Sequence, residues 1–148
     1  METIHAADLV FAAWDAEPVE NGAVVVVQDR IGAVGPYEEL RGRFPRARVR
    51  RWRGSLGPAR IHDGPLPEAP SPRERVHAVL KRGAVVVLTA YADSPGLRAA
   101  ADRNDVLVVP AARPARLTET ARADLAVFDE AGECLATVCA GRLVHRRK

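Results

Sequence analysis

Two adjacent residues, His62 and Asp63, have side chains that could support acid–base chemistry in a loop. A histidine that is oriented by a carboxylate can act as a general base near neutral pH. Adjacent residues seldom orient each other well, however, and the nearest hydroxyl belongs to Ser55. His62 and Asp63, together with Asp93, are therefore the candidate catalytic residues, and ordinary loop residues are the simpler interpretation.

Polar residues also follow the apolar run Ala84–Leu88, which we expect to form a buried strand. In open α/β units, small ligands bind at the carboxyl ends of strands, beside helix N-termini. The candidate ligand-binding residues at this position are Thr89, Tyr91 and Ser94. The structural alternative is that Asp93 and Ser94 cap a helix that begins at Pro95.

A metal site requires three or four donors that converge. The histidines are His5, His62, His77 and His145, and their spacing gives no metal-binding pair. His5 and His145 lie near the two ends, and His77 falls on the polar side of an expected helix, so we expect surface histidines. Cys134 and Cys139 are five residues apart on one expected strand and should face opposite sides, which disfavours a disulfide or a shared metal. We therefore predict no metal and no cofactor.

The composition favours a single globular domain outside the membrane. The chain has 148 residues, 47% of them hydrophobic, and a net charge of +3. No apolar run approaches the roughly 18 residues of a membrane span, and no signal peptide is apparent, so we expect a cytoplasmic protein. Heavy use of arginine and alanine with almost no lysine is typical of GC-rich genomes such as those of actinobacteria.

Arginines are densest between residues 41 and 53, where Trp52 lies among them. Such a stretch could bind single-stranded nucleic acid or an acidic partner. Glu38 and Glu39 lie close by, and the whole chain is rich in arginine, so a solvated arginine face is the favoured interpretation over nucleic-acid binding.

Apolar periodicity predicts β-rich ends around a helical middle. The expected strands cover residues 7–11, 23–27, 31–34, 47–53 (as an exposed or edge strand), 84–88, 106–109, 123–128, 134–138 and 142–145. The expected helices cover residues 37–44, 72–82 and 95–103. Residues 54–71 are rich in proline and glycine and are expected to form an irregular linker. The strand–helix–strand order of residues 84–109 predicts a right-handed parallel βαβ unit.

Short motifs at both ends resemble the small β-domain that flanks the catalytic barrel of metal-dependent amidohydrolases, such as imidazolonepropionase and aminodeoxyfutalosine deaminase. The motifs are Ala7-Asp8-Leu9-Val10, the run 21–36, Arg122-Ala123-Asp124-Leu125 and Gly141-Arg142-Leu143-Val144. The resemblance implies an α+β fold: a composite β-sandwich built from N- and C-terminal strands, with one inserted βαβ unit and two to three helices. It also implies one domain, 1–148, with sandwich halves 1–64 and 115–148 around an insert, 65–114, far shorter than the ~250 residues of a barrel.

In that superfamily a Gly-x-x-x-Pro-Gly-x-x-(Asn/Asp)-x-His-x-His segment supplies two histidine ligands of the catalytic metal. Gly54 and Pro58 match the first two fixed positions, but the ligand positions fall on Gly64 and Leu66. Neither residue carries a donor atom.

Three functional hypotheses follow. The favoured one is a non-catalytic, amidohydrolase-like binding or interaction module, whose partner would be a second copy of the chain, a neighbouring-gene product or an unknown small molecule. An alternative is a hydrolase of non-peptide C–N bonds with a metal-free or partner-completed site. A further alternative is an arginine-mediated binder of nucleic acid or an acidic partner.

Overall fold

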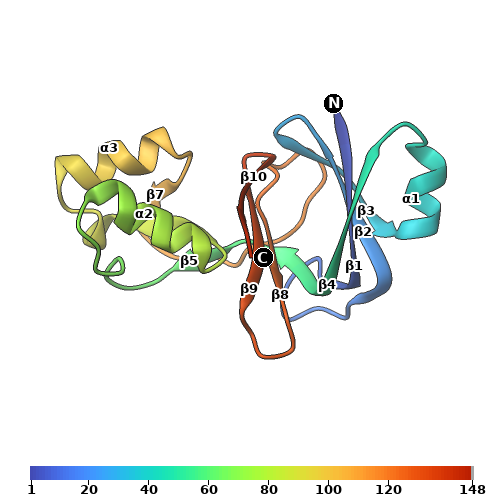
Figure 1. The fold of residues 1–148 in the computed structure, drawn as a ribbon, viewed down its shortest axis with the longest axis horizontal. Coiled ribbons are helices and arrows are strands. Elements are labelled where there is room, and N and C mark those ends of the chain that lie inside the picture. Colours follow the sequence, from blue (N-terminus) through green and yellow to red (C-terminus); the bar gives the residue numbers. More distant parts are fainter. Residues whose placement is uncertain (148) are drawn as a thin grey trace.

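The computed structural model describes residues 1–147, which form two β-sheets and three α-helices (Figure 1). The larger sheet has the strand order β10-β9-β8-β4-β1-β2-β3, and the smaller has the order β5-β6-β7. The strands of the larger sheet are β1 (Glu2–Val10), β2 (Val19–Val27), β3 (Arg30–Pro36), β4 (Arg48–Pro58), β8 (Leu125–Phe128), β9 (Cys134–Cys139) and β10 (Arg142–Arg146). Those of the smaller sheet are β5 (Arg60–His62), β6 (Ala84–Leu88) and β7 (Leu107–Val109).

The two ends of the chain meet in the larger sheet, where β4 pairs antiparallel with β8 over Ser55–Pro58. On its other side, β4 runs parallel to β1, which pairs antiparallel with β2. The buried valines of β2 and Ile4 of β1 fill the centre of this sheet. The composite β-fold that the terminal motifs imply is therefore confirmed.

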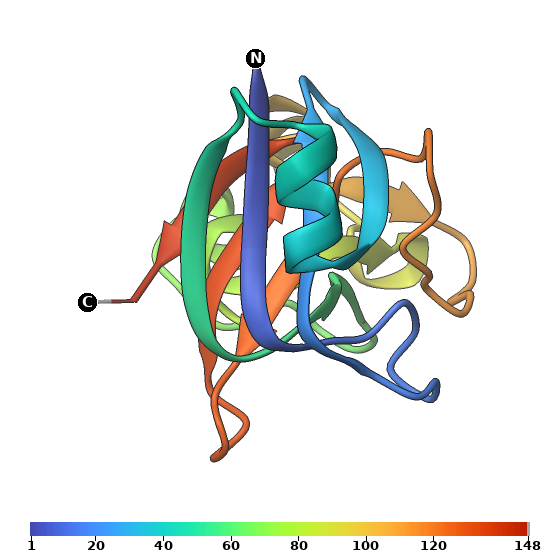
Figure 2. The ribbon, with the colours of Figure 1, turned by 90° about the vertical axis from the view of Figure 1, so that its right-hand side faces the viewer.

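Helix α1 (Tyr37–Arg43) packs against the strands at the N-terminal end of the chain (Figure 2). Its buried residues Tyr37 and Leu40 join Ile4 and Val25 in one apolar cluster. Pro36 is the N-cap residue, and Glu38 and Glu39 fall in the first turn, where carboxylates interact favourably with the helix dipole.

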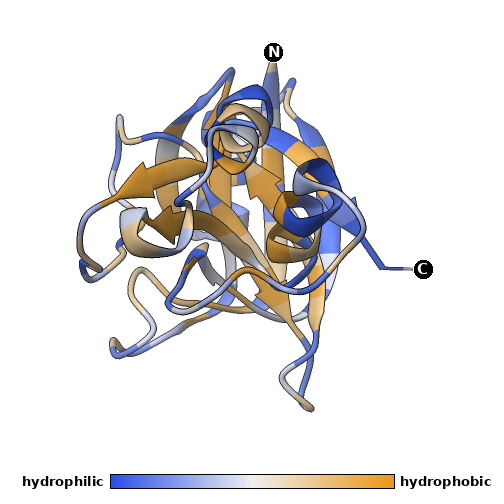
Figure 3. Ribbon diagram, turned by 90° about the vertical axis from the view of Figure 1, so that its left-hand side faces the viewer, coloured by the Kyte–Doolittle hydropathy of each residue, from blue (hydrophilic) through white to orange (hydrophobic). Residues whose placement is uncertain are grey.

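The smaller sheet joins β5 to the insert strands β6 and β7. All its strand pairs are parallel, and helices α2 (Pro72–Lys81) and α3 (Pro95–Arg103) pack beside it. Val76, Val79 and Leu80 of α2 are buried, as their spacing predicts. Strands β6 and β7, joined through α3, form the predicted βαβ unit. Figure 3 shows that the strands of this sheet are hydrophobic and that the helices carry hydrophilic segments.

The insert and the larger sheet share one core. Ala126, Phe128 and Cys139 from β8 and β9 belong to the same apolar cluster as Leu80 and Val85 of the insert. The buried hydroxyl of Thr137 donates a hydrogen bond to the carbonyl oxygen of Leu80 at 2.7 Å. The division into sandwich halves 1–64 and 115–148 and an insert 65–114 stays a prediction, and β5 already pairs with the insert strand β6.

The predicted linker over residues 54–71 is wrong in its first half. Strand β4 continues to Pro58, and β5 follows at Arg60–His62. Gly54 explains the error: its φ of +92° lets the strand bend as it leaves an edge position beside β1 and enters the position between β1 and β8. The first half of β4 is thus an edge strand, as predicted, and the second half is central.

No helix among the described residues has the length and apolar character that crossing a membrane would require.

Candidate functional site

The catalytic candidates lie at the carboxyl edge of the smaller sheet. His62 ends β5, and its Nε2 lies 2.9 Å from the carbonyl oxygen of Pro65, so the imidazole is held by its own loop. Asp63 and Asp93 are exposed, and no hydrogen bond joins His62 to either of them in the described chain. The three residues do not form a general-base pair in this structure, and their catalytic role stays a prediction.

The three ligand-binding candidates follow β6. Thr89 and Tyr91 lie in a 3₁₀ turn, Thr89–Tyr91, directly before α3. The hydroxyl of Ser94 accepts a hydrogen bond from the backbone N–H of Leu97 at 3.1 Å, so Ser94 is the N-cap of α3. The capping interpretation is confirmed for Ser94, and ligand binding by these three residues stays a prediction.

The two positions where the superfamily has metal-binding histidines serve structural purposes here. Gly64 has a φ of +140°, a conformation that L-residues with side chains rarely adopt. Leu66 is 3% exposed and packs in the core with α2, while its carbonyl oxygen accepts a hydrogen bond from Arg75. Residues 1–147 contain no group of three or more His, Cys, Asp or Glu that could hold a metal ion. Gly64 and Leu66 therefore supply no metal ligand at these two positions.

The prediction of a surface position for His5 is wrong. Strand β1 begins at Glu2, and His5 lies inside the sheet with 3% of its surface exposed. Its Nδ1 accepts a hydrogen bond from the indole N–H of Trp52 at 3.2 Å. Burial, together with the positive charge of Arg50, lowers the pKa of His5 to about 4. The imidazole is neutral at pH 7 and is part of the core.

The other two histidines differ in their surroundings. His77 is exposed on α2, as predicted. His145 lies half-buried on β10, with Nε2 3.3 Å from the carbonyl oxygen of Cys134. Cys134 and Cys139 are free thiols, and burial raises the pKa of both, that of Cys139 to about 11. Neither thiol is therefore an activated nucleophile at neutral pH.

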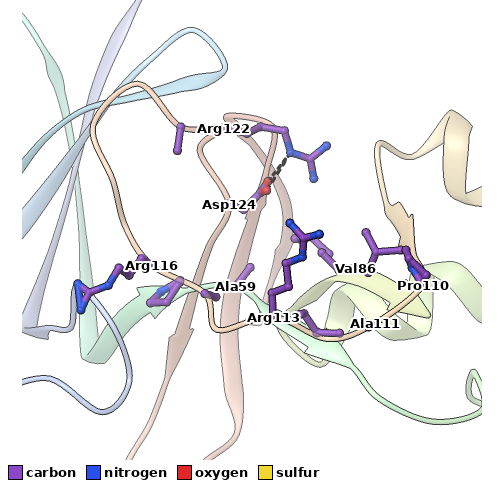
Figure 4. A pocket seen from close by; sticks show the side chains of 14 residues that line it. Ala59, Val86, Pro110, Ala111, Arg113, Arg116, Arg122 and Asp124 are labelled. Atoms are coloured by element: carbon purple, nitrogen blue, oxygen red, sulfur yellow. Dashed lines mark hydrogen bonds and ion pairs between the residues drawn. The ribbon is translucent and has the colours of Figure 1, made fainter. Parts of the chain in front are cut away.

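The sequence gives no direct warning of a pocket of about 490 Å³ between the smaller sheet and the segment 110–124, which we name the sheet pocket. One side is formed by apolar residues of the three strands of the smaller sheet, namely Ile61, Val86 and Val109. The facing side is formed by Pro110, Ala111, Arg113 and Arg116 of the loop, followed by Arg122 and Asp124. Figure 4 shows these side chains around the cavity.

An ion pair lies at one end of the sheet pocket. Arg122 Nε lies 2.8 Å from Asp124 Oδ2, and the two side chains are 20% and 19% exposed. Burial alone would lower the pKa of Arg122, but the hydrogen bond and the charge of Asp124 outweigh it and raise that pKa. Asp124 also accepts a hydrogen bond from the backbone N–H of Ala140 at 2.9 Å, so its carboxylate is fully engaged.

Arg113 and Arg116 line the pocket without an ion-pair partner in residues 1–147. In Figure 4 the guanidinium of Arg113 points toward the Arg122–Asp124 pair, whereas that of Arg116 points away from it. Arg113 thus points toward a carboxylate that is already paired with Arg122, and its own positive charge lacks a counter-charge among the described residues.

Comparison with known proteins places this arrangement in a structural class. Residues 22–47 match the family model described as the imidazolonepropionase-like composite domain of bacteria. A search of curated proteins finds no match. Guanine deaminase of E. coli superposes with a TM-score of 0.56 at 14% identity, over 73% of this chain and 35% of that one. Guanine deaminase of Bradyrhizobium japonicum gives 0.55 at 14% identity, over 73% and 34%.

Triazine hydrolase from Arthobacter aurescens gives a TM-score of 0.51 at 16% identity, over 72% of this chain and 34% of that one. The chain thus spans about a third of the length of these structures, and at such identities the likeness concerns the fold. The fold is that of an amidohydrolase-type composite domain. Within that fold, residues 22–47 resemble the imidazolonepropionase-like composite domain, and the described residues contain no catalytic barrel.

Proposed function

We propose that this protein is a non-catalytic binding module that holds a small amphipathic carboxylate in the sheet pocket. The observation that carries the proposal is the lining of the pocket, which combines an apolar wall with an uncompensated guanidinium. Among the described residues, this lining includes no serine, threonine, cysteine, lysine or histidine.

The apolar wall supports the binding of a hydrophobic ligand body. Ile61, Val86 and Val109 come from three adjacent parallel strands and are each partly exposed. A pocket of about 490 Å³ lies within the size range of roughly 300–1,000 Å³ that is typical of small-molecule sites. Covering such side chains contributes on the order of 25 cal/mol per Å² of apolar surface removed from water.

The charge at one end supports an anionic group on the same ligand. Arg113 points toward an ion pair whose carboxylate is already bound by Arg122 and by the N–H of Ala140. A ligand carboxylate placed here would receive the guanidinium of Arg113 in a bidentate contact, which is the favoured geometry for this pair. A ligand with a single carboxylate and an apolar body matches both features.

The same lining argues against catalysis within this pocket. Asp124 is the proton acceptor among the lining side chains, and its two oxygens are bound by Arg122 and Ala140. A carboxylate whose two oxygens are both already hydrogen-bonded to the protein is poorly placed to take a proton from a ligand. Hydrolysis of a C–N bond would need the residues His62, Asp63 and Asp93, and no hydrogen bond joins the side chain of His62 to either carboxylate in the described residues.

Titration calorimetry with 4-phenylbutyrate tests the proposal. We expect saturable binding to the protein, and about tenfold weaker binding to Arg113→Gln, equivalent to ~1.4 kcal/mol. Val86→Asp, which places a charge in the apolar wall, should abolish binding. Arg103→Gln, which removes an exposed arginine of α3 outside the pocket, is the matched control and should bind as the parent does.

The uncharged analogue 4-phenylbutanol should bind the parent protein about as weakly as 4-phenylbutyrate binds Arg113→Gln. Equal affinities of the parent and Arg113→Gln for 4-phenylbutyrate, or the absence of saturable binding, would contradict the proposed function.

A further inference from the structure

A second pocket, of about 410 Å³, lies on a different part of the molecule and is rich in positive charge. We name it the cationic pocket. It is formed where the start of β5, the C-terminal end of α2, the turn between β8 and β9, and β10 come together. The charged and titratable residues that line it are Arg60, Lys81, Arg82, Glu133, His145 and Arg147.

The positive charges in this pocket exceed the negative ones. Glu133 is the acidic residue of the lining, and it forms an ion pair with Arg147. Arg60, Lys81 and Arg82 form no ion pair within residues 1–147. Lys81 and Arg82 lie at the C-terminal end of α2, where the helix dipole offsets part of their charge. Arg60 has no such compensation.

Arg60 is held in place by aromatic rings. Its guanidinium carbon lies 3.9 Å from the centroid of the Phe128 ring and 5.4 Å from that of Trp14. The Phe128 ring is itself fixed, because Trp14 meets it edge-on at 5.5 Å and Gly83 packs against it too closely for a β-carbon. Stacking occupies the face of the guanidinium and leaves its N–H edge free to donate. The described structure records no hydrogen bond from this side chain.

His145 adds a polar side chain to the lining. Its Nε2 lies 3.3 Å from the carbonyl oxygen of Cys134, and since a carbonyl only accepts, Nε2 carries the proton in the neutral ring. The positive groups that face it are Arg60, Lys81, Arg82 and Arg147, and the negative one is Glu133.

We propose that the cationic pocket binds a phosphate group, carried either by inorganic phosphate or by a small phosphomonoester. A pre-positioned guanidinium edge suits two oxygens of a phosphate, and the neighbouring ammonium and guanidinium groups neutralise a second negative charge. Binding is non-covalent, since the Cys134 thiol in the lining is half-buried and its burial raises its pKa. This site is separate from the sheet pocket, and neither proposal depends on the other.

Titration of ¹⁵N-labelled protein with inorganic phosphate and with phenyl phosphate, at constant ionic strength set with sodium chloride, tests this inference. We expect saturable shifts of the amides of Lys81, Arg82, Gly132 and Cys134. In Arg60→Gln the apparent Kd should rise about tenfold. Arg82→Gln should raise it by a smaller factor, since its charge is partly offset, and Arg103→Gln should leave it unchanged.

Tighter binding of phenyl phosphate would identify a phosphomonoester as the ligand class, and tighter binding of inorganic phosphate would identify the free ion. Shifts that grow linearly without saturation, or that remain unchanged in both Arg60→Gln and Arg82→Gln, would overturn the inference. Amide spectra of the free variants show whether each is folded before the titration begins.

Discussion

His5 has the most perturbed histidine environment in the described chain, and its position gives the protein a defined sensitivity to acid. The folded state holds the pKa near 4, against 6.5 for the unperturbed group, because burial and Arg50 disfavour the imidazolium. Between these two values the unfolded chain binds a proton that the folded chain does not. The free energy of unfolding should therefore be unaffected by His5 above pH 6.5 and should fall by roughly 3 kcal/mol as the pH drops to 4.

Urea unfolding at pH 7.5, 5.5 and 4.5 measures this loss. In His5→Gln, the free energy of unfolding should no longer show the loss that binding of one proton causes between pH 6.5 and 4. His77→Gln, which changes an exposed histidine, should retain most of it. An unchanged slope in His5→Gln would show that His5 is not the group responsible.

Individual residues differ in how far the sequence alone reveals their role. The lack of donors at Gly64 and Leu66 needs only their identities, so the misfit with a metal site is predictable. The burial of His5 is not, because β1 begins five residues before the first strongly apolar motif residues at Ala7–Val10. The approach of Arg113 to the Arg122–Asp124 pair depends on the path of a loop that has no regular structure, and no local pattern indicates it.

At the scale of elements, the bend of β4 at Gly54 joins the two ends of the chain into one sheet. A β-carbon at Gly54 would lie 2.2 Å from the carbonyl oxygen of Phe128, and the φ of +92° is unfavourable for any side chain. Gly132 has a similar φ of +82° but nothing within 4 Å of its β-carbon position. Comparing substitutions at the two glycines therefore distinguishes the cost of backbone strain from the cost of steric contact.

We expect Gly132→Ala to cost roughly 1 kcal/mol of unfolding free energy, the lower end of the strain range for a left-handed residue. Gly54→Ala should cost roughly 3 kcal/mol or more, since the close contact is with backbone that cannot rotate away. Chemical denaturation of both variants measures the difference. Equal losses would mean that β4 and β8 can separate slightly without penalty.

The helices are the elements that the sequence predicts best. Proline at the first position with serine before it marks the starts of α2 and α3, and Gly83, at a φ of +84°, follows the end of α2. These signals are local, so they can be recognised in the sequence without knowledge of the fold. The continuation of β4 and the formation of β5 depend instead on pairing with β8 and β6, which lie far along the chain. The glycine and proline content of this part of the sequence also predicts a loop there.

At the scale of the whole molecule, the insert leaves Leu107 on β7 44% exposed, and β7 pairs with β6 alone. A second copy of the chain or another partner protein at this strand edge stays a prediction, as does the cytoplasmic location. The parallel strands and helices of the insert were predictable as a unit, because strand–helix–strand order fixes the handedness of the connection. Their attachment to β8 and β9 was not, because it rests on contacts between side chains distant in sequence.

That attachment should make the two sheets unfold together. Thr137 is fully buried on β9, and its hydroxyl donates to the carbonyl oxygen of Leu80 at the end of α2. Thr137→Val keeps the shape of the side chain but removes this hydrogen bond, while the carbonyl keeps the one from the backbone N–H of Gly83 at 3.1 Å, so we expect a cost of about 1 kcal/mol. Because Leu80, Val87 and Cys139 share one core cluster, the loss should be felt in both sheets.

Amide hydrogen exchange reports the free energy of opening at each site separately. In Thr137→Val, the amides of Val25 in the larger sheet and Val87 in the smaller should lose protection by the same amount. Thr118→Val, an exposed change in the 110–119 loop, should alter neither. If Val87 lost protection while Val25 kept it, the insert would be an independent folding unit, and the continuity of the core across β8, β9 and α2 would not couple the two sheets.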